Sequence, residues 1–315
     1  MPSIDSSAEP LRLELSAVVV AVTADEPRVL VVEGGAALPS GPLEPAHRTL
    51  ELGLRAWVEA QTRQPLGYVE QLYTFADRDR TPGHEERVIS LSYLALAREP
   101  TACDSIGADA SWQNWYRYFP WEDWRGGPNR LVADIILPRL AAWAEEAADP
   151  MVRRQRLQRV AVTFGANDRS WNEDLVLQRF ELLYEAGLVP EAARTRPIPA
   201  DRLIPGEAMA HDHRRILATG IARLRAKIKY RPVVFELLPA AFTLLQLQRS
   251  VEALAGRRLH KQNFRRLIEA QGLVEETGEI EVGTGGRPAK LVRFRREILA
   301  ERAVSGTKLP LSRTA

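Results

Sequence analysis

Cysteine is almost absent from this chain of 315 residues, because Cys103 is the only one. A single cysteine cannot form an intrachain disulfide, and the absence of a Cys/His cluster argues against a structural zinc site. We therefore expect a protein of the reducing cytoplasm that uses no structural metal and no cofactor.

Long hydrophobic runs are also missing. No stretch of 18 uncharged apolar residues occurs, and the N-terminus lacks the basic region and apolar run of a secretory signal. The sequence thus predicts neither a membrane span nor secretion. Apolar residues make up 45% and charged residues 27% of the chain, which is typical of a globular protein with room for two domains.

An excess of one charge is missing from the chain as a whole, whose formal net charge is only +2. The distribution is nevertheless uneven. Acidic residues are common before Asp149, and basic residues dominate from His211 onward. This asymmetry favours a protein with one DNA-facing end.

The most informative pattern lies near the C-terminus and begins with two helices. Thr243 is a candidate N-cap, and Gly256 ends the first helix. Apolar residues recur between them at helical spacing: Leu244, Leu247, Val251 and Leu254. The second predicted helix is Lys261–Ala270, followed by Gly272. Its expected inward-facing residues are Phe264, Leu267 and Ile268.

The opposite face of the second helix is rich in hydrogen-bond donors. Arginine suits guanine, asparagine or glutamine suits adenine, and lysine or arginine pairs with phosphate. The predicted DNA-binding residues of this face are Lys261, Gln262, Asn263, Arg265 and Arg266. The alternative to DNA binding is a small helical domain whose basic face is exposed to solvent and binds nothing.

A two-stranded wing is predicted after these helices, near Leu273–Glu275 and Leu291–Phe294, with a glycine-rich turn between the strands. Arg287 and Lys290 are further predicted DNA contacts, and more basic residues follow: Arg293, Arg295 and Arg296. Helix, turn, basic helix and basic wing in this order favour a winged helix-turn-helix that binds double-stranded operator DNA.

The N-terminal part alternates strands with one helix. Strands are predicted at four places: Leu11–Ala21, Arg28–Val32, Gly67–Phe75 and Arg87–Ala97. A helix is predicted at Leu50–Gln61, with its apolar residues on one side. Strands before and after a helix indicate an α+β sandwich.

This layout resembles the Nudix fold. Aligning Gly41 with the first glycine of the Nudix box, G-x5-E-x7-R-E-U-x-E-E-x-G-U, places Arg55 on the box arginine and Glu59 on one of the paired glutamates. The other acidic positions read His47, Ala56 and Ala60, and the second glycine reads Thr62. Nudix enzymes hold magnesium with these glutamates, and one remaining carboxylate cannot supply that cluster.

The resemblance therefore implies a degenerate site with no catalytic and no metal-binding residues. Arg55 is expected to orient the adjoining loop through backbone carbonyls. Glu59 is either a residual ligand contact or an ordinary exposed carboxylate.

A degenerate Nudix domain followed by a winged helix resembles the Nudix-related transcriptional regulators of bacterial NAD metabolism. Six segments carry the resemblance: residues 70–96, 209–239, 242–248, 263–266, 277–279 and 286–294. It implies a homodimer that represses NAD metabolism genes and senses ADP-ribose or an NAD-like nucleotide. Arg80 and Arg87 lie in the family's strand-loop-strand signature, and with Arg55 and Glu59 they are the predicted ligand-binding residues. Surface salt bridging is the alternative for Arg80.

One region departs from the family pattern, because about eighty residues intervene before the linker helix. Helices are expected at Asn129–Ala147, Pro150–Val162 and Trp171–Ala186, the last with Ser170 as N-cap. Four nearby tryptophans are either a ligand-stacking cage or packing residues: Trp112, Trp115, Trp121 and Trp124. His211 and His213 are interpreted as a capping and packing feature.

The predicted architecture is a Nudix-type α/β/α sandwich with a helical insert, followed by a winged helix-turn-helix. The expected boundaries are 1–122 for the effector-sensing domain, 123–205 for the insert, 206–232 for the linker helix that completes the sensing domain, 233–300 for the DNA-binding domain and 301–315 for a tail. Two other functions stay open: a Nudix hydrolase of nucleoside diphosphate derivatives with an atypical metal site, and a module whose winged helix binds protein.

Overall fold

The computed structural model describes residues 11–76, 87–100, 106–281 and 288–298. Contacts between residues divide the chain into two compact units. The first unit comprises Met1–Leu237 and Ser250–Arg258, and the second comprises Leu238–Arg249 and Leu259–Ala315. Within the described ranges, no helix is both long and apolar enough to cross a bilayer.

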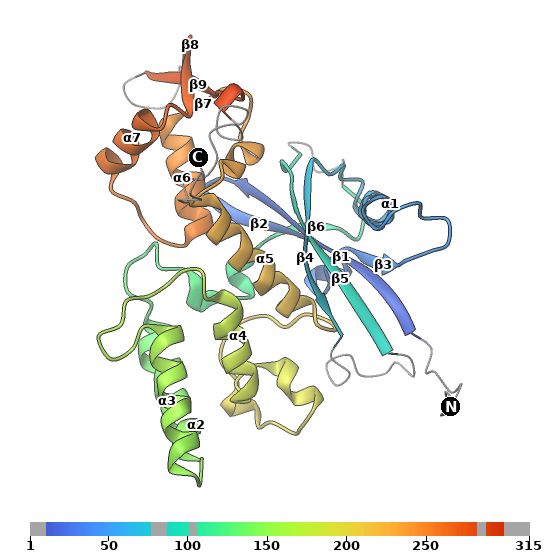
Figure 1. Ribbon diagram of the computed structural model, residues 1–315, viewed down its shortest axis with the longest axis vertical. Helices are drawn as coiled ribbons and strands as arrows, with labels where there is room; N and C mark the ends of the chain where they lie inside the picture. The colour runs from blue at the N-terminus through green and yellow to red at the C-terminus, as the bar shows by residue number, and fades with distance from the viewer. Residues whose placement is uncertain (1–10, 77–86, 101–105, 282–287, 299–315) are drawn as a thin grey trace, which may run out of the picture. The chain divides into compact units, whose positions relative to one another are not determined.

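A mixed sheet forms the centre of the first unit (Figure 1). Its strand order is β4-β5-β1-β2-β6, and β3 pairs with β1. The central strand β1 is parallel to β5 and antiparallel to β2 and β3. The strands are β1 Leu11–Thr23, β2 Glu26–Val31, β3 Ser40–Pro42, β4 Tyr68–Phe75, β5 Arg87–Leu96 and β6 Ser111–Asn114. The four strands expected from the sequence are confirmed.

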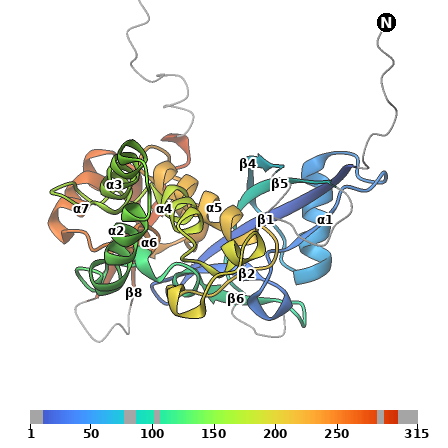
Figure 2. The ribbon, with the colours of Figure 1, turned by 90° about the horizontal axis from the view of Figure 1, so that it is seen from below.

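The sheet is covered on both faces, because the middle of β1 is apolar on both. Leu15, Ala17, Val19 and Ala21 share a buried cluster with Leu54 and Val58 of helix α1, Leu50–Thr62. Val18 points to the other face, where a Cβ on Gly220 of helix α5 (His213–Ile228) would lie only 2.8 Å from its Cγ1. Helices α1 and α5 therefore sandwich the sheet, as two views show (Figures 1 and 2).

Three helices form the insert. A π-helical turn, Val132–Ile136, runs into α2, Leu137–Glu145, which packs along α3, Pro150–Phe164 (Figure 2). Helix α4, Val176–Glu185, packs against α5. The three helices expected here exist, and α3 begins at Pro150 as predicted, with Asp149 accepting a hydrogen bond from the Met151 amide (2.8 Å).

The predicted start of α4 is wrong. The helix begins at Val176, so Ser170 is not its N-cap. Tertiary contacts place Trp171 elsewhere: its ring lies 4.5 Å from that of Trp124, and the Arg179 guanidinium stacks over it at 3.8 Å. Aromatic and cation–π contacts thus override a plausible local cap.

The second unit contains the elements of a winged helix. A small sheet of order β7-β9-β8 consists of Phe242–Thr243, Ala289–Phe294 and Val274–Glu281. Helix α6, Leu244–Ala255, starts in this unit, and α7 covers Lys261–Ala270, as the sequence predicted. Strand β8 is longer than expected, and Gly278, with φ of 85°, lies in an irregular stretch of the β8–β9 pairing.

Candidate functional site

Helix α6 is fixed at its N-terminus by a reciprocal cap. The Gln246 amide donates to the Thr243 hydroxyl (3.2 Å), and the Thr243 amide donates to Oε1 of Gln246 (2.7 Å). This is a capping box, which satisfies two amides that the first turn leaves without partners. The predicted N-cap is confirmed.

Helix α7 presents a polar face to solvent. Phe264 and Ile268 are buried, whereas Leu267 is 54% exposed, so the expectation that Leu267 faces inward is wrong. Leu267 directly precedes Ile268 in the helix. Its side chain therefore lies outside the narrow apolar stripe that Phe264 and Ile268 form. The five predicted groove residues are all exposed: Lys261, Gln262, Asn263, Arg265 and Arg266. Helical geometry therefore brings them onto one broad, donor-rich surface.

The wing is less basic than its sequence suggested. Nζ of Lys290 lies 2.8 Å from Glu276, and Nε of Arg293 lies 2.6 Å from Glu275. Both acceptors are on β8, directly across from the basic strand β9, and both pairs are exposed. Lys290 must exchange one carboxylate partner for a phosphate if it is to bind DNA. Arg287 lies outside the described residues.

Gly41, the first glycine of the box pattern, contacts Trp57 of α1. The Trp57 indole donates to the Pro42 carbonyl (2.8 Å), and a Cβ on Gly41 would lie 2.3 Å from the indole ring. A side chain at position 41 would thus displace the tryptophan. The glycine that opens the box pattern is needed here for close packing of strand β3 on α1.

Arg55 is held by the chain itself. Its Nη2 donates to the Gly67 carbonyl (3.0 Å), its Nη1 to the Leu66 carbonyl, and its Nε to Glu51 (3.0 Å). The expectation that Arg55 orients the loop after α1 through backbone carbonyls is confirmed. A role in binding ligand stays a prediction.

The carboxylate positions of the box lie on one exposed side of α1. Ala56, Glu59 and Ala60 are all exposed, and Glu59 and Ala60 follow Ala56 by three and four residues, which places both beside it on the helix. Glu59 is the one carboxylate among these three. Across the part of the chain that the structure describes, no three or more His, Cys, Asp or Glu side chains gather where they could hold a metal ion.

The two remaining predicted ligand-binding residues are Arg80 and Arg87. Arg80 lies outside the described residues, and Arg87 is the first residue of β5, opposite Leu11 of β1. A hollow of about 610 Å³ lies between the start of α1 and strands β4 and β5. Its lining is Thr49, Leu50, Glu51, Val69, Glu70, Gln71 and Tyr93. The lining contains two carboxylates and no arginine, which is unfavourable for a diphosphate.

His213 and the tryptophans are packing residues. His213 opens α5 and accepts a hydrogen bond from the Leu38 amide at Nδ1 (3.0 Å), and burial lowers its pKa to about 3. Trp115 and Trp121 are fully buried, and Trp112 is 8% exposed. The indole of Trp124 donates to the Trp121 carbonyl (3.1 Å). Side chains that are this enclosed favour packing over a ligand cage.

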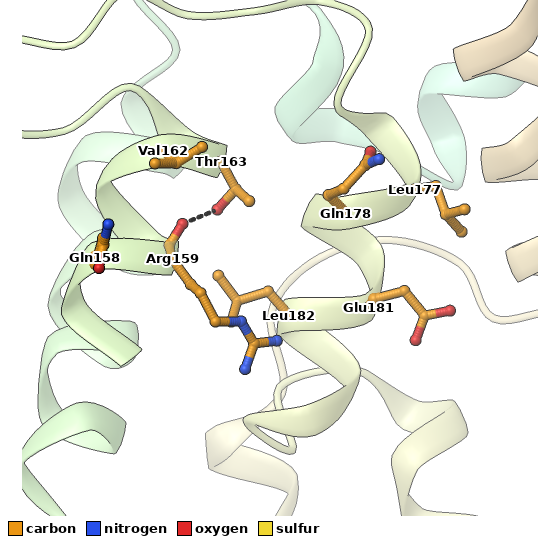
Figure 3. A pocket seen from close by; sticks show the side chains of 8 residues that line it. All are labelled: Gln158, Arg159, Val162, Thr163, Leu177, Gln178, Glu181 and Leu182. Carbon is orange, nitrogen blue, oxygen red and sulfur yellow. Dashed lines mark hydrogen bonds between the residues drawn. The ribbon is translucent and has the colours of Figure 1, made fainter. Parts of the chain in front are cut away.

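A second hollow, of about 420 Å³, lies between α3 and α4 of the insert (Figure 3). Its lining is Gln158, Arg159, Val162, Thr163, Leu177, Gln178, Glu181 and Leu182. The charged residues are engaged, since Arg159 pairs with Glu185 (2.6 Å) and Glu181 with Arg215. The walls that remain are apolar or neutral.

Comparison with a family model decides what the C-terminal elements are. Residues 234–294 match the NrtR DNA-binding winged helix domain. This segment is similar to the NrtR winged helix family. Its match contains α6, α7 and the three strands of the second unit, so the exposed surface of α7 lies on the second helix of an NrtR-type winged helix.

A curated relative matches over a limited part. The ADPR responsive transcriptional repressor NtrR of Acinetobacter baylyi is 41% identical over 86 residues, which are 27% of this chain and 34% of the relative. The match thus spans about a third of the relative's length.

Solved structures show that the whole fold is shared. Shewanella oneidensis NrtR in complex with a 27mer DNA matches with a TM-score of 0.54 and 20% identity, over 90% of this chain and 93% of that one. A MutT/nudix family protein from Enterococcus faecalis matches with a TM-score of 0.52 and 16% identity, over 91% and 88%. At these identities the likeness establishes the fold: an α+β chain with a Nudix-type sandwich and a winged helix.

Proposed function

We propose that this chain is a DNA-binding transcriptional regulator, acting as a repressor of NAD metabolism genes. The observation that carries the proposal is the donor-rich surface of α7 in a segment similar to the NrtR winged helix family. Lys261, Arg265 and Arg266 supply cations for phosphates, and Gln262 and Asn263 supply paired donors and acceptors for adenine. Phe264 and Ile268 anchor the helix, so this surface stays presented.

The first unit is proposed to bind the effector, ADP-ribose or an NAD-like nucleotide. The curated relative is named as ADPR responsive, and the first unit has the Nudix-type sandwich. Such a ligand can change DNA affinity only by binding the free and DNA-bound shapes differently, typically by about 1–3 kcal/mol. We propose the division given by the sequence: sensing by residues 1–122 and 206–232, and DNA binding by residues 233–300.

The bound nucleotide is proposed to leave unchanged, because the box helix lacks its carboxylates. Glu59 alone, with Ala56 and Ala60 beside it, offers magnesium too few oxygen ligands. The regulator is further proposed to act as a homodimer in the cytoplasm. Its two recognition helices would then bind half-sites about 34–36 Å apart on one face of the duplex.

Salt dependence tests the DNA-binding proposal. Three phosphate-neutralising side chains on α7 predict that log affinity falls with log salt concentration with a slope of about −3 per chain. Fluorescence anisotropy on a duplex recovered by the chain from a random-sequence library gives this slope. A salt-insensitive, weak association would instead favour the protein-binding module.

ADP-ribose tests the proposed effector. Its addition should change the affinity of the chain for DNA. Magnesium-dependent release of AMP from ADP-ribose at enzyme-like rates would instead favour the hydrolase.

Restoring the two missing glutamates tests the explanation for the lost chemistry. The double substitution Ala56→Glu and Ala60→Glu places three carboxylates on one exposed side of α1 and should restore magnesium binding in calorimetry. The same change of charge at two exposed neutral residues of α3, as Gln155→Glu and Gln158→Glu, should not. Equal magnesium binding by both variants would show a general charge effect rather than a site.

A further inference from the structure

The C-terminal end of α6 is capped by side chains of the first unit. The Tyr116 hydroxyl donates to the Ala253 carbonyl (2.7 Å), and Nε of Arg225 donates to the Leu254 carbonyl (2.9 Å). The Trp124 amide donates to the Gly256 carbonyl (2.7 Å). These carbonyls belong to Ser250–Arg258, which the contacts assign to the first unit. The last turn of a helix leaves such carbonyls without partners, and here other segments of the chain supply them.

Arg225 is itself fixed by a buried ion cluster. Its Nη1 lies 2.6 Å from Oε2 of Glu122, and the same carboxylate binds Arg179 through Nε (2.6 Å) and Nη2 (2.9 Å). All three side chains are at most 1% exposed. Arg179 comes from helix α4 of the insert, and Arg225 from α5, which covers the sheet. The Glu122 carboxylate thus connects the guanidinium that caps α6 to Arg179 of the insert.

The packing around this cap is tight. Gly256 has φ of 73°, and a Cβ there would lie 2.4 Å from the Glu122 carbonyl and 2.9 Å from both the Tyr116 hydroxyl and Nη2 of Arg225. The positive charge of Arg225 also meets the negative end of the helix dipole. Burial raises the pKa of the Tyr116 hydroxyl, which therefore remains a donor at neutral pH. A side chain at position 256 therefore cannot be accommodated unless Glu122, Tyr116 or Arg225 moves.

We propose that Tyr116, Trp124, Arg225 and the carbonyls of Ala253, Leu254 and Gly256 form a latch through which the effector-binding unit controls the winged helix segment. Residues 253–256 lie inside the NrtR winged helix match, yet their polar partners follow strand β6 or lie on α5. The latch rests on the proposed function. It also assigns a role to the insert, because Arg179 of α4 binds the same carboxylate, Glu122, that holds Arg225.

A matched pair of tyrosines tests the latch. Tyr116→Phe removes the hydroxyl that binds the Ala253 carbonyl. Tyr118→Phe removes another buried hydroxyl, two residues away, that donates to the Gly35 carbonyl at the same 2.7 Å. Each change deletes one oxygen atom and the hydrogen bond that it donates, and Tyr116→Phe also removes the longer bond that Nη2 of Arg225 donates to this hydroxyl (3.4 Å). We expect Tyr116→Phe to speed hydrogen exchange of the amides of residues 253–257 by roughly 2- to 10-fold, and Tyr118→Phe to leave it unchanged.

The same variants test control of DNA binding. The ratio of DNA affinities with and without ADP-ribose, measured on the library-selected duplex, should change by about 2- to 30-fold in Tyr116→Phe and stay at the wild-type value in Tyr118→Phe. Equal exchange in all three proteins, or equal ratios, overturns the latch. Failure of the wild-type chain to bind DNA overturns the proposed function instead, and the exchange comparison still judges the contacts of the latch.

Discussion

Replacement of Glu122 by alanine is expected to lower the free energy of unfolding by about 3–5 kcal/mol, since it leaves two buried arginines without their carboxylate. Glu122 is 1% exposed and accepts hydrogen bonds from Arg179 and Arg225. No other carboxylate is bonded to either guanidinium among the described residues; their remaining acceptors are neutral oxygens. Chemical denaturation followed by tryptophan fluorescence measures the loss, because Trp124 and Trp171 lie beside the cluster.

An exposed ion pair provides the control for this substitution. Glu207 lies 2.7 Å from Arg117, and both side chains are about half exposed. Glu207→Ala should therefore cost only about 0–1 kcal/mol, because water screens the pair and replaces the lost contact. If the two variants unfold at the same denaturant concentration, the buried cluster does not stabilise the first unit.

Loss of both arginines from α7 is expected to abolish most of the DNA affinity. Arg265 and Arg266 are exposed and adjacent, on the surface that we assign to the groove and its phosphates. Each contact contributes about 1–3 kcal/mol, so each substitution by alanine should weaken binding roughly 5- to 150-fold. Binding of ADP-ribose to the first unit should be unaffected. Anisotropy for DNA and calorimetry for the nucleotide separate the two effects.

The chain offers a matched control for this pair as well. Arg153 and Arg154 are adjacent, exposed arginines on α3, so Arg153→Ala and Arg154→Ala make the same change of charge on another helix. They should leave DNA affinity close to the wild-type value. An equal loss in both double variants would mean that overall charge, rather than the α7 surface, drives binding. An unchanged affinity after loss of Arg265 and Arg266 would show that α7 is not the groove-facing helix.

Elements with strong local signals could be predicted from the sequence. The bounds of α7 follow from its apolar spacing and the glycine beyond its end, and Thr243 could be recognised as a cap because Gln246 follows three residues later. Arg55 could be assigned to the loop after α1 because the box pattern fixes its place on that helix. These features involve residues within about a dozen positions of one another.

Predictions from local sequence were incomplete or wrong where long-range contacts decide the structure. Ser170 looked like a cap, but Trp171 packs on Trp124 and Arg179 instead. Lys290 was predicted as a DNA contact, but it forms an ion pair with Glu276 of the neighbouring strand β8. Neither partner is marked by spacing or composition, because the sequence does not state which strand or ring will be adjacent.

The sequence by itself determined the order of elements and the basic surface of α7, because each depends on helical or strand periodicity. Its resemblance to the Nudix box marked the carboxylates that α1 lacks. Only the tertiary structure decided that Glu122 joins Arg179 and Arg225, which lie 57 and 103 residues away, and that Tyr116 reaches the end of α6. A buried charge needs a partner of opposite charge, and the fold can bring that partner from any position in the chain. Such a cluster therefore shows no periodic pattern in the sequence.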